Sequence, residues 1–236
     1  MIMAIQSIPV SVLYLVATPI GNLDDFSHRA IEILKNADRI ACEDTRTSSR
    51  LLKQYDIRKP LFSFHQHNEH RKVENIMEML DNGEVVALIS DAGMPGISDP
   101  GFLAVRAAHQ RGHTVQTIPG PDACTTALVT SGLPSDRYLF EGFLPPKKGR
   151  QTRLQEIAER DVTTVLYESP HRLLKLLDEL LEHAGPDRLA CVAKELTKTF
   201  EETDRAPLGE LQARWHQRES IKGEYVVIVS GKTYSE

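Results

Sequence analysis

The chain has 236 residues and a formal net charge of -5, with 41% hydrophobic and 26% charged residues. This is the composition of a globular protein with a buried core, long enough for one large or two small domains. The negative net charge argues against an overall positive surface for nonspecific DNA binding, so we expect no DNA partner. Any contact with nucleic acid has to come from a local basic patch.

The cysteines and the lengths of the apolar runs indicate the compartment in which we expect the protein to function. Cys42, Cys124 and Cys191 lie far apart and form no C-x-x-C pair, which disfavours a disulfide or zinc framework and fits a reducing cytoplasm. Residues 1–12 lack a basic segment followed by a long apolar core, so we expect no signal peptide. No apolar run reaches membrane-spanning length, so we expect no membrane partner.

Strand-like and helix-like patterns alternate through the first half of the chain. Short apolar or β-branched runs predict strands, and apolar residues at helical spacing predict helices. Ser27 is the expected N-cap of the first helix, and Asn82-Gly83 is expected to end the third. In chain order the elements are a strand at 10–17, a helix at 27–36, a strand at 39–43, a helix at 48–55, a strand at 60–64, a helix at 69–81, a strand at 84–90, a helix at 102–111 and a strand at 114–118.

The same alternation continues after Pro119-Gly120-Pro121, the strongest break in the chain. We therefore expect two domains, 1–120 and 121–236. The pattern predicts an α/β fold with two α/β domains and largely parallel sheets. The later elements are a helix at 122–131, a strand at 138–142, a helix at 150–160, a strand at 162–167, a helix at 171–184, a strand at 189–194, a further strand near 201–203, a helix at 208–217 and a strand at 224–229.

The most unusual segment is the loop at 90–101, which reads Ser-Asp-Ala-Gly-Met-Pro-Gly-Ile-Ser-Asp-Pro-Gly. Glycine lets a backbone approach a ligand closely, and proline fixes turns. Open α/β sheets bind small molecules in such loops at the carboxyl ends of their strands. The alternative is a tight strand-to-helix turn without a ligand.

Two other segments bear on nucleotide binding. Residues 18–25, Thr-Pro-Ile-Gly-Asn-Leu-Asp-Asp, follow the first strand as a ligand-binding turn would, but they lack the G-x-G-x-x-G dinucleotide fingerprint. Gly231-Lys232-Thr233 resembles the end of a P-loop, but no glycine lies five residues earlier and no helix is predicted after it. We therefore expect neither a dinucleotide nor a nucleoside triphosphate.

Charged side chains follow several predicted strands. Glu43, Asp44 and Arg46 come after the second strand, where they could orient a hydroxyl group or take its proton. The alternative is an Arg–carboxylate pair, with Asp44 or Thr45 capping the next helix. Segments 167–172 and 194–198 also end strands with charged and hydroxyl groups, which suggests a second wall of one cleft. Either segment alone could be a helix cap or an ion pair.

Two clusters of ionisable residues suggest a binding site, and each also has a simpler structural interpretation. In a strand, His65 and His67 would share one face, but an open metal site needs about three ligands and a supporting shell. We favour the rim of a polar pocket and expect no metal. The segment 147–153 carries four cations and no anion, which suits an RNA phosphate backbone or a solvated loop.

Eight motifs, in order between about residues 13 and 231, together resemble the tetrapyrrole (corrin/porphyrin) methylase superfamily. Within it, they are most similar to the branch that methylates small-subunit ribosomal RNA. The motifs are TPIGNLDD (18–25), ACEDTR (41–46), HQHNEH (65–70), SDAGMPGISDPG (90–101), PGPDA (119–123), GLPSDRYLFEGFLP (132–145), YESPHR (167–172) and KELTKTFEE (194–202).

The resemblance implies two α/β domains that hold S-adenosylmethionine in a cleft between them, usually in a homodimer. It implies 2'-O-methylation of a cytidine ribose in the decoding region of 16S rRNA, within the small ribosomal subunit. TPIGNLDD replaces the glycine-rich first loop of members that act on tetrapyrroles, which favours RNA. The alternatives are a methylase of a small tetrapyrrole-like substrate and a noncatalytic RNA-binding module.

The resemblance also implies roles for particular residues. Glu43 or Asp44 is expected to act on the ribose hydroxyl, with Arg46, Glu168, Lys194 or Glu195 positioning phosphate and ribose. Met94 stands where the family pattern has threonine, and family members usually continue past Gly231 into a small helical tail. The expected RNA patch is Lys147, Lys148, Arg150 and Arg153. The expected cofactor contacts are Gly21, Asn22, Asp91, Gly93, Pro95, Ile97, Ser98, Pro119, Gly120, Pro121 and Ala123.

Overall fold

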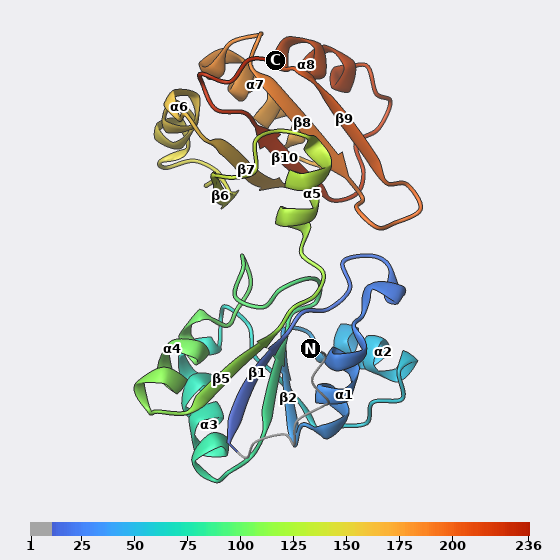
Figure 1. Ribbon diagram of the computed structural model, residues 1–236, viewed down its shortest axis with the longest axis vertical. Helices are drawn as coiled ribbons and strands as arrows, with labels where there is room; N and C mark the ends of the chain where they lie inside the picture. Colours follow the sequence, from blue (N-terminus) through green and yellow to red (C-terminus); the bar gives the residue numbers. More distant parts are fainter. Residues whose placement is uncertain (1–10) are drawn as a thin grey trace. The chain divides into compact units, whose positions relative to one another are not determined.

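The computed structural model describes residues 11–236 and divides the chain into two compact units, Met1–Asp122 and Ala123–Glu236 (Figure 1). We call them unit 1 and unit 2. Each is built around a five-stranded sheet of its own, flanked by helices. The expected pair of α/β domains is confirmed at this level. No helix among the described residues is long and apolar enough to cross a membrane.

The sheet of unit 1 is entirely parallel, with the strand order β3-β2-β4-β1-β5. All five strands therefore end at the same edge, which we call the carboxyl edge of unit 1. Its strands are β1 (Val12–Val16), β2 (Arg39–Cys42), β3 (Leu61–Ser63), β4 (Val86–Ile89) and β5 (Thr114–Ile118).

Helices cover both faces of this sheet. Alternate residues of β1 face opposite sides, so Val12 and Tyr14 join one core cluster while Leu13 and Leu15 join the other. Burial on both faces explains why the strands read as continuous apolar runs. The helices are α1 (His28–Asn36) and α2 (Thr45–Gln54) on one face, and α3 (Glu69–Asp81) and α4 (Phe102–Gln110) on the other (Figure 1).

Side-chain caps determine where the first two helices begin. The Ser27 hydroxyl accepts a hydrogen bond from Ala30 N at 3.1 Å, so the predicted N-cap of α1 is confirmed. Helix α2 begins three residues earlier than predicted, because the Asp44 carboxylate accepts from Arg46 N at 2.8 Å. The short 3-10 helix η1 (Leu23–Asp25) was not expected from the sequence.

The sheet of unit 2 is mixed, with the order β6-β7-β10-β8-β9. Only β6 and β7 pair in parallel; the other pairs are antiparallel, so the expectation of a largely parallel sheet is wrong here. The short connection between β8 and β9 makes a hairpin, which forces antiparallel pairing. The strands are β6 (Tyr138–Phe143), β7 (Thr163–Glu168), β8 (Leu189–Lys194), β9 (Glu202–Pro207) and β10 (Tyr225–Val229).

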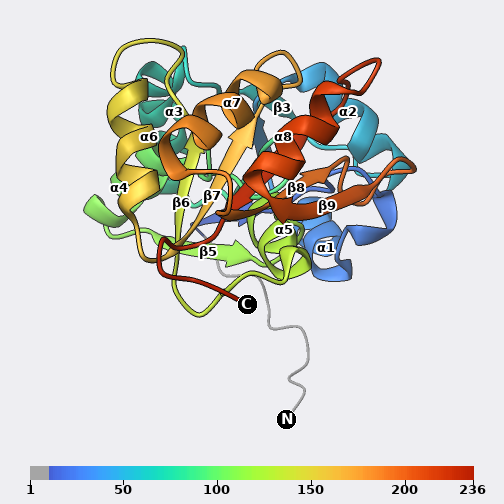
Figure 2. The same ribbon diagram turned by 90° about the horizontal axis from the view of Figure 1, so that it is seen from above.

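Three helices cover one face of this sheet and one lies on the other, as Figures 1 and 2 show. The main core packs Leu154, Leu177 and Trp215 from those three helices against Val227 of the central strand. Gly231 follows β10, and a Cβ atom there would lie 2.3 Å from the Asp161 carbonyl oxygen, so this glycine serves close packing. The helices are α6 (Arg150–Glu159), α7 (Leu173–Ala184) and α8 (Leu208–His216) on the first face, and α5 (Ala123–Ser131) on the second.

Candidate active site

Polar and conformationally unusual residues gather at the carboxyl edge of unit 1. The segments that follow β1, β2, β4 and β5 all begin there, because the four strands run in parallel. They carry most of the residues expected to bind a cofactor or to act on a hydroxyl group. The structure therefore brings these sequence motifs together on one unit.

The segment after β1 is fixed to the loop 90–101 by a small network of hydrogen bonds. Thr18 N donates to Gly93 O, and Gly93 N donates to Thr18 O, each at 2.9 Å. The Thr18 hydroxyl donates to Ser90 O at 3.1 Å, and the Ser90 hydroxyl donates to Gly93 O at 3.0 Å. Thr18 and Ser90 are both buried, so the network is shielded from water and holds the two segments in one arrangement.

Glycine is required at two close approaches in this region. Gly101 has φ +150, and a Cβ atom there would lie 3.1 Å from both Gly96 N and Leu88 Cδ2, so it closes the loop 90–101 on itself. A Cβ atom at Gly120 would lie 2.9 Å from Ala17 Cβ, so the segment after β5 packs tightly beside the end of β1. Ser98 has φ +60, which is uncommon for a residue other than glycine. The loop is shaped by its backbone, as its composition predicts.

The residues expected to contact a cofactor differ in exposure. Gly93 and Pro95 are buried and shape the loop, whereas Asp91, Ile97 and Ser98 are exposed on it. The remaining residues lie on neighbouring segments. Gly21, Asn22, Pro119 and Gly120 are exposed and Pro121 is half-buried at the same edge, while Ala123 is the first residue of α5 in unit 2.

Three carboxyl groups at this edge have pKa values above their ordinary range. Burial, together with the charges of Glu43 and Asp91, raises the pKa of Asp99 to about 6 against the opposing effect of a hydrogen bond from Ser90. Burial also raises the pKa of Glu43, as does the charge of Asp91. For Asp91, burial and the charge of Asp44 outweigh a hydrogen bond from Asp44 N at 3.2 Å. Three such groups in one place are typical of a functional site.

The sequence reasoning included the loop around Asp99 but did not single out Asp99, Thr18 or Ser90. The signal for Asp99 was present, because it lies in the same loop as Asp91 and directly precedes Pro100. Nothing in the sequence indicated that Thr18 and Ser90 would hydrogen-bond across 72 residues of chain.

Asp44 and Arg46 form the helix cap and the Arg–carboxylate pair that the sequence offers as the alternative to a catalytic role. Asp44 caps α2 and forms an ion pair with Arg46 at 3.2 Å. The hydrogen bond from the Arg46 side chain holds the pKa of Asp44 below its ordinary value, so this carboxylate is a weak base. Glu43 makes no hydrogen bond or ion pair to another side chain among residues 11–236. Of the two predicted carboxylates, Glu43 is the one suited to accept a proton.

The histidine-rich segment follows β3 instead of lying within a strand. His65 Nε2 and Asn68 Nδ2 lie 3.1 Å apart, and the His65 and His67 rings pack edge to face at 5.9 Å. Asn68 also accepts from His65 N at 2.9 Å, so this amide organises the turn into α3. Among residues 11–236, no group of three or more His, Cys, Asp or Glu side chains is placed to hold a metal ion.

In unit 2, Lys194 is the last residue of strand β8 and Glu195 follows it. Lys194 Nζ lies 3.9 Å from Glu202 Oε2. Burial raises the pKa of Glu195, but hydrogen bonds from Lys198 Nζ and Glu224 N, each at 2.9 Å, bring it below its ordinary value. Glu195 is thus a satisfied ion-pair partner, and its carboxylate is a poor general base.

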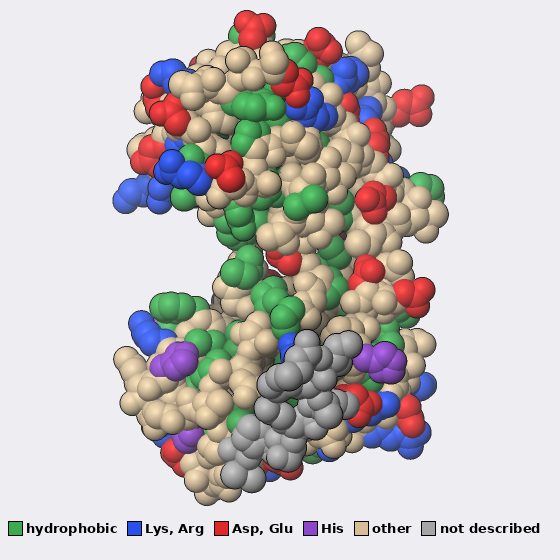
Figure 3. Space-filling view, viewed as in Figure 1, with side chains coloured by type: hydrophobic (Ala, Val, Ile, Leu, Met, Phe, Trp, Pro, Cys, Tyr) green, Lys and Arg blue, Asp and Glu red, His purple; other side chains and the backbone are tan. Residues whose placement is uncertain are grey.

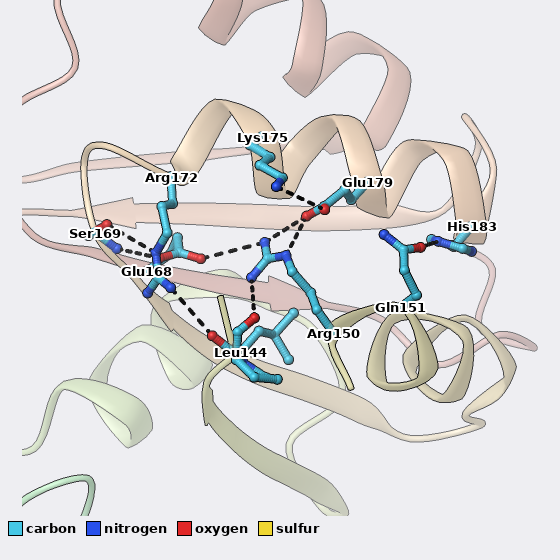
Figure 4. Close-up of polar contacts among 10 residues, drawn as sticks. Leu144, Arg150, Gln151, Glu168, Ser169, Arg172, Lys175, Glu179 and His183 are labelled. Carbon is cyan, nitrogen blue, oxygen red and sulfur yellow. Dashed lines mark hydrogen bonds and ion pairs between the residues drawn. The ribbon is translucent and has the colours of Figure 1, made fainter. Parts of the chain in front are cut away.

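Glu168 belongs to a buried ion network instead of an open site (Figure 4). Its side chain is 0% exposed, and its Oε1 atom accepts from Ser169 N and faces Arg172 Nε, both at 2.8 Å. Its Oε2 atom lies 3.8 Å from Arg150 Nη2. Its burial and its pairing with Arg172 and Arg150 argue against the expectation that Glu168 positions phosphate or ribose.

Arg150 occupies the centre of the same network. Its side chain is only 3% exposed, Nε donates to Glu179 Oε2 at 2.8 Å, and Nη2 lies 2.6 Å from that oxygen (Figure 4). The expectation that Arg150 forms part of an RNA patch is therefore corrected. No sequence pattern indicates Glu179 as its partner, since 29 residues separate the two.

Of the other three cations in the predicted basic patch, only two are free of ion pairs within residues 11–236. Lys147 and Lys148 are exposed, and within residues 11–236 neither forms an ion pair. Arg153 is half exposed but contacts Glu156 at 2.9 Å and Glu141 at 3.5 Å. Acidic and basic side chains are interspersed over the face drawn in Figure 3. The available positive charge of this loop is that of two lysines.

Replacing Arg150 should destabilise unit 2 strongly. Arg150→Ala leaves Glu168 and Glu179 without their buried cation, which costs about 3–5 kcal/mol, whereas Lys148→Ala on the surface should change the free energy of unfolding by less than about 0.5 kcal/mol. Denaturant unfolding of both variants measures the difference. Equal stability of the two variants would contradict the buried network.

Asp99 should make unit 1 less stable as pH rises. Its pKa is near 6 when folded and 3.8 as the ordinary value, so its contribution is most favourable below 3.8 and is lost as pH rises through 6. Asp99→Asn removes this dependence, so wild type should lose about 1–2 kcal/mol relative to the variant between pH 4 and 7. Unfolding across this range measures it, with exposed Asp25→Asn as control. A constant difference between wild type and Asp99→Asn would rule the effect out.

The fold agrees with the folds of solved structures. The uroporphyrin-III-C-methyltransferase of Thermus thermophilus matches with a TM-score of 0.64 and 18% identity, covering 94% of this chain and 95% of that one. The cobalt precorrin-4 methyltransferase matches with the same TM-score and 14% identity, covering 93% and 95%. At these identities the likeness concerns the fold.

Sequence relatives are much closer. A protein of Escherichia coli O157:H7 named ribosomal RNA small subunit methyltransferase I is 47% identical over 226 residues, covering 95% of this chain and 79% of the relative. Proteins of the same name from Pseudomonas aeruginosa and Halalkalibacterium halodurans are 49% and 48% identical, covering 93% of this chain and 78% and 75% of theirs.

A family model spans most of both units. It matches residues 12–212 and describes the tetrapyrrole (corrin/porphyrin) methylases. The match begins at the first residue of β1 and includes the whole carboxyl edge of unit 1. The chain therefore belongs to the tetrapyrrole (corrin/porphyrin) methylase family.

Proposed function

We propose that the protein transfers the methyl group of S-adenosylmethionine to the 2'-oxygen of a cytidine ribose in the decoding region of 16S rRNA. The observation that carries the proposal is the identity of 47–49% with ribosomal RNA small subunit methyltransferase I proteins over 93–95% of the chain. The substrate is the small ribosomal subunit in the cytoplasm, and the expected assembly is a homodimer.

The carboxyl edge of unit 1 fits the cofactor chemically. S-adenosylmethionine carries positive charge on its sulfonium and ammonium groups, and Glu43, Asp91 and Asp99 supply negative charge at this edge. The close packing at Gly101 and Gly120 keeps backbone groups, instead of side chains, at the surface of the edge. The residues proposed to hold the cofactor here are Gly21, Asn22, Asp91, Gly93, Pro95, Ile97, Ser98, Pro119, Gly120 and Pro121; a contact from Ala123 stays a prediction.

Catalysis in this proposal rests mainly on alignment. The bound cofactor supplies an electrophilic methyl group, so the protein has to hold the ribose oxygen in line with it, which can lower the barrier by several kcal/mol. The network of Thr18, Ser90 and Gly93 supports this, because it fixes two of the segments that form the edge. A rigid edge keeps the reacting groups in place without further ordering.

Glu43 is the proposed general base. A ribose hydroxyl is a poor nucleophile until its proton is drawn away, and Glu43 Oε would accept that proton. Its raised pKa makes it a stronger base than an ordinary carboxylate, and it is not held by another side chain among the described residues. Asp44 is the weaker choice because it caps α2.

Cations are needed to bring RNA to an edge that bears three carboxyl groups, because phosphates are repelled by them. Arg46 is the nearest along the chain, and its side chain is 86% exposed despite the ion pair with Asp44. Lys147, Lys148 and Lys194 are the further candidates in unit 2. Phosphate contacts would position the nucleotide, and the edge would act on its ribose.

The decisive test offers the tritiated methyl group of S-adenosylmethionine to undermethylated small subunits, to naked 16S rRNA and to a tetrapyrrole precursor. We expect label on a cytidine ribose of the decoding region, in the subunit or in the naked RNA. Label on the tetrapyrrole alone would support the alternative substrate. Calorimetry with S-adenosylmethionine that detects no binding would exclude both methylases and favour a noncatalytic module.

The proposed base is tested under single-turnover conditions with Glu43→Gln. We expect the rate of methyl transfer at saturating S-adenosylmethionine to fall about 10²–10⁴-fold. Exposed Glu78→Gln on α3 is the matched control and should react at the wild-type rate. If Glu43→Gln, Asp44→Asn and Glu195→Gln all keep the wild-type rate, none of these three carboxylates acts as base and the proposal for Glu43 is wrong.

A further inference from the structure

Helix α2 has a charge pattern unlike that of the other helices. It carries Arg46, Arg50 and Lys53 and no carboxylate, and among the α-helices of residues 11–236 no other has three Lys or Arg residues without Asp or Glu. This occurs in a chain whose net charge is -5. The concentration of positive charge on one helix is therefore not a consequence of overall composition.

The three cations share one side of α2. They are spaced at i, i+4 and i+7, which places them on the same face, while Ser48 and Leu52 are buried on the other. Every exposed side chain of the helix carries a hydrogen-bond donor, of which the Ser49 hydroxyl already donates to Thr45 O. These side chains are Arg46, Thr47, Ser49, Arg50, Lys53 and Gln54.

These charges are poorly neutralised within the protein. Within the described part of the chain, Arg50 and Lys53 lie within ion-pair distance of no carboxylate. Ordinary surface helices here carry their own counter-charges: Lys35 lies 4.0 Å from Glu32 on α1, and Arg214 lies 3.3 Å from Glu210 on α8. A merely solvated helix face would be expected to mix both signs in this way.

Helix α2 also begins next to the residue proposed to act on the ribose. It starts at Thr45, two residues after Glu43, and its 10 residues extend about 15 Å from the carboxyl edge of unit 1. Arg, Lys, Ser, Thr and Gln side chains are those that contact phosphate and sugar oxygens in nucleic-acid complexes. An RNA strand whose ribose lies at Glu43 could follow this face without meeting a carboxylate of α2.

We propose that the outer face of α2 binds the phosphate backbone of the RNA next to the nucleotide that reacts. The inference rests on the proposed function, since it takes the RNA substrate and the reacting edge from there. It adds a backbone-binding surface on unit 1, in which Arg50 and Lys53 contact phosphates and have no part in the chemistry.

The test uses the full chain with Arg50→Gln and Lys53→Gln combined. The matched control is Arg29→Gln with Lys35→Gln on α1, which removes the same charge from exposed positions of the same unit. Equilibrium binding to undermethylated small subunits is measured between 50 and 300 mM salt, roughly the range in which phosphate contacts dominate affinity. Calorimetry with S-adenosylmethionine and denaturant unfolding accompany each variant.

We expect the α2 variant to bind the subunits about tenfold more weakly near 100 mM salt, with a salt dependence shallower by about 1.4, since each contact to single-stranded RNA contributes about 0.7. Its cofactor affinity and stability should equal those of wild type, and the α1 variant should bind as wild type does. Wild-type affinity and an unchanged salt dependence in the α2 variant would overturn the proposal.

The two proposals fail in different ways. If wild type binds the subunits but transfers no methyl group, the proposed function is wrong, and the α2 surface is still judged by its salt dependence. If wild type transfers methyl and the α2 variant binds RNA equally well, only the α2 surface is wrong. If wild type does not bind the subunits at all, the α2 proposal is overturned with the substrate it assumes.

Discussion

The reciprocal backbone hydrogen bonds between Thr18 and Gly93 are the constraint on which the candidate site depends. They join the segment after β1 to the loop after β4, and the buried hydroxyls of Thr18 and Ser90 reinforce the junction. A parallel sheet brings strand ends to one edge but does not fix the loops that follow. Here the loops are fixed by hydrogen bonds shielded from water and by glycines that allow close approach.

The same edge concentrates negative charge that the fold must tolerate. Burial raises the pKa values of Glu43, Asp91 and Asp99, and the charges of neighbouring carboxylates add to it, so each ionised group raises the free energy of the folded state at neutral pH. Functional sites commonly contain charged groups that make the folded state less stable. In unit 2, by contrast, the buried cation Arg150 lies beside the buried carboxylates of Glu168 and Glu179, so these charges are paired within the core (Figure 4). One group of charges is therefore available for chemistry and the other is structural.

Sequence reasoning was accurate where a local signal decides the outcome. Helical periodicity gave the bounds of α3, the Ser27 cap was confirmed, and the composition of loop 90–101 indicated its unusual backbone. It failed where distant residues decide: the antiparallel pairing of β10 depends on strands far along the chain, and Arg150 is buried because Glu179 lies one helix away. A run of cations in a sequence does not reveal which of them face inward. The resemblance of eight ordered motifs pointed to the family, and the match of the family model to residues 12–212 confirmed that identification.

The central claim is that the carboxyl edge of unit 1 binds S-adenosylmethionine. Amide hydrogen exchange of the full chain, with and without saturating S-adenosylmethionine, tests it most directly, because exchange reports local opening segment by segment. The account predicts slower exchange in segments 17–22, 90–101 and 119–121, and no change along β3 or in the loop at 144–149. Protection confined to other segments, or none at all when calorimetry detects binding, would contradict it.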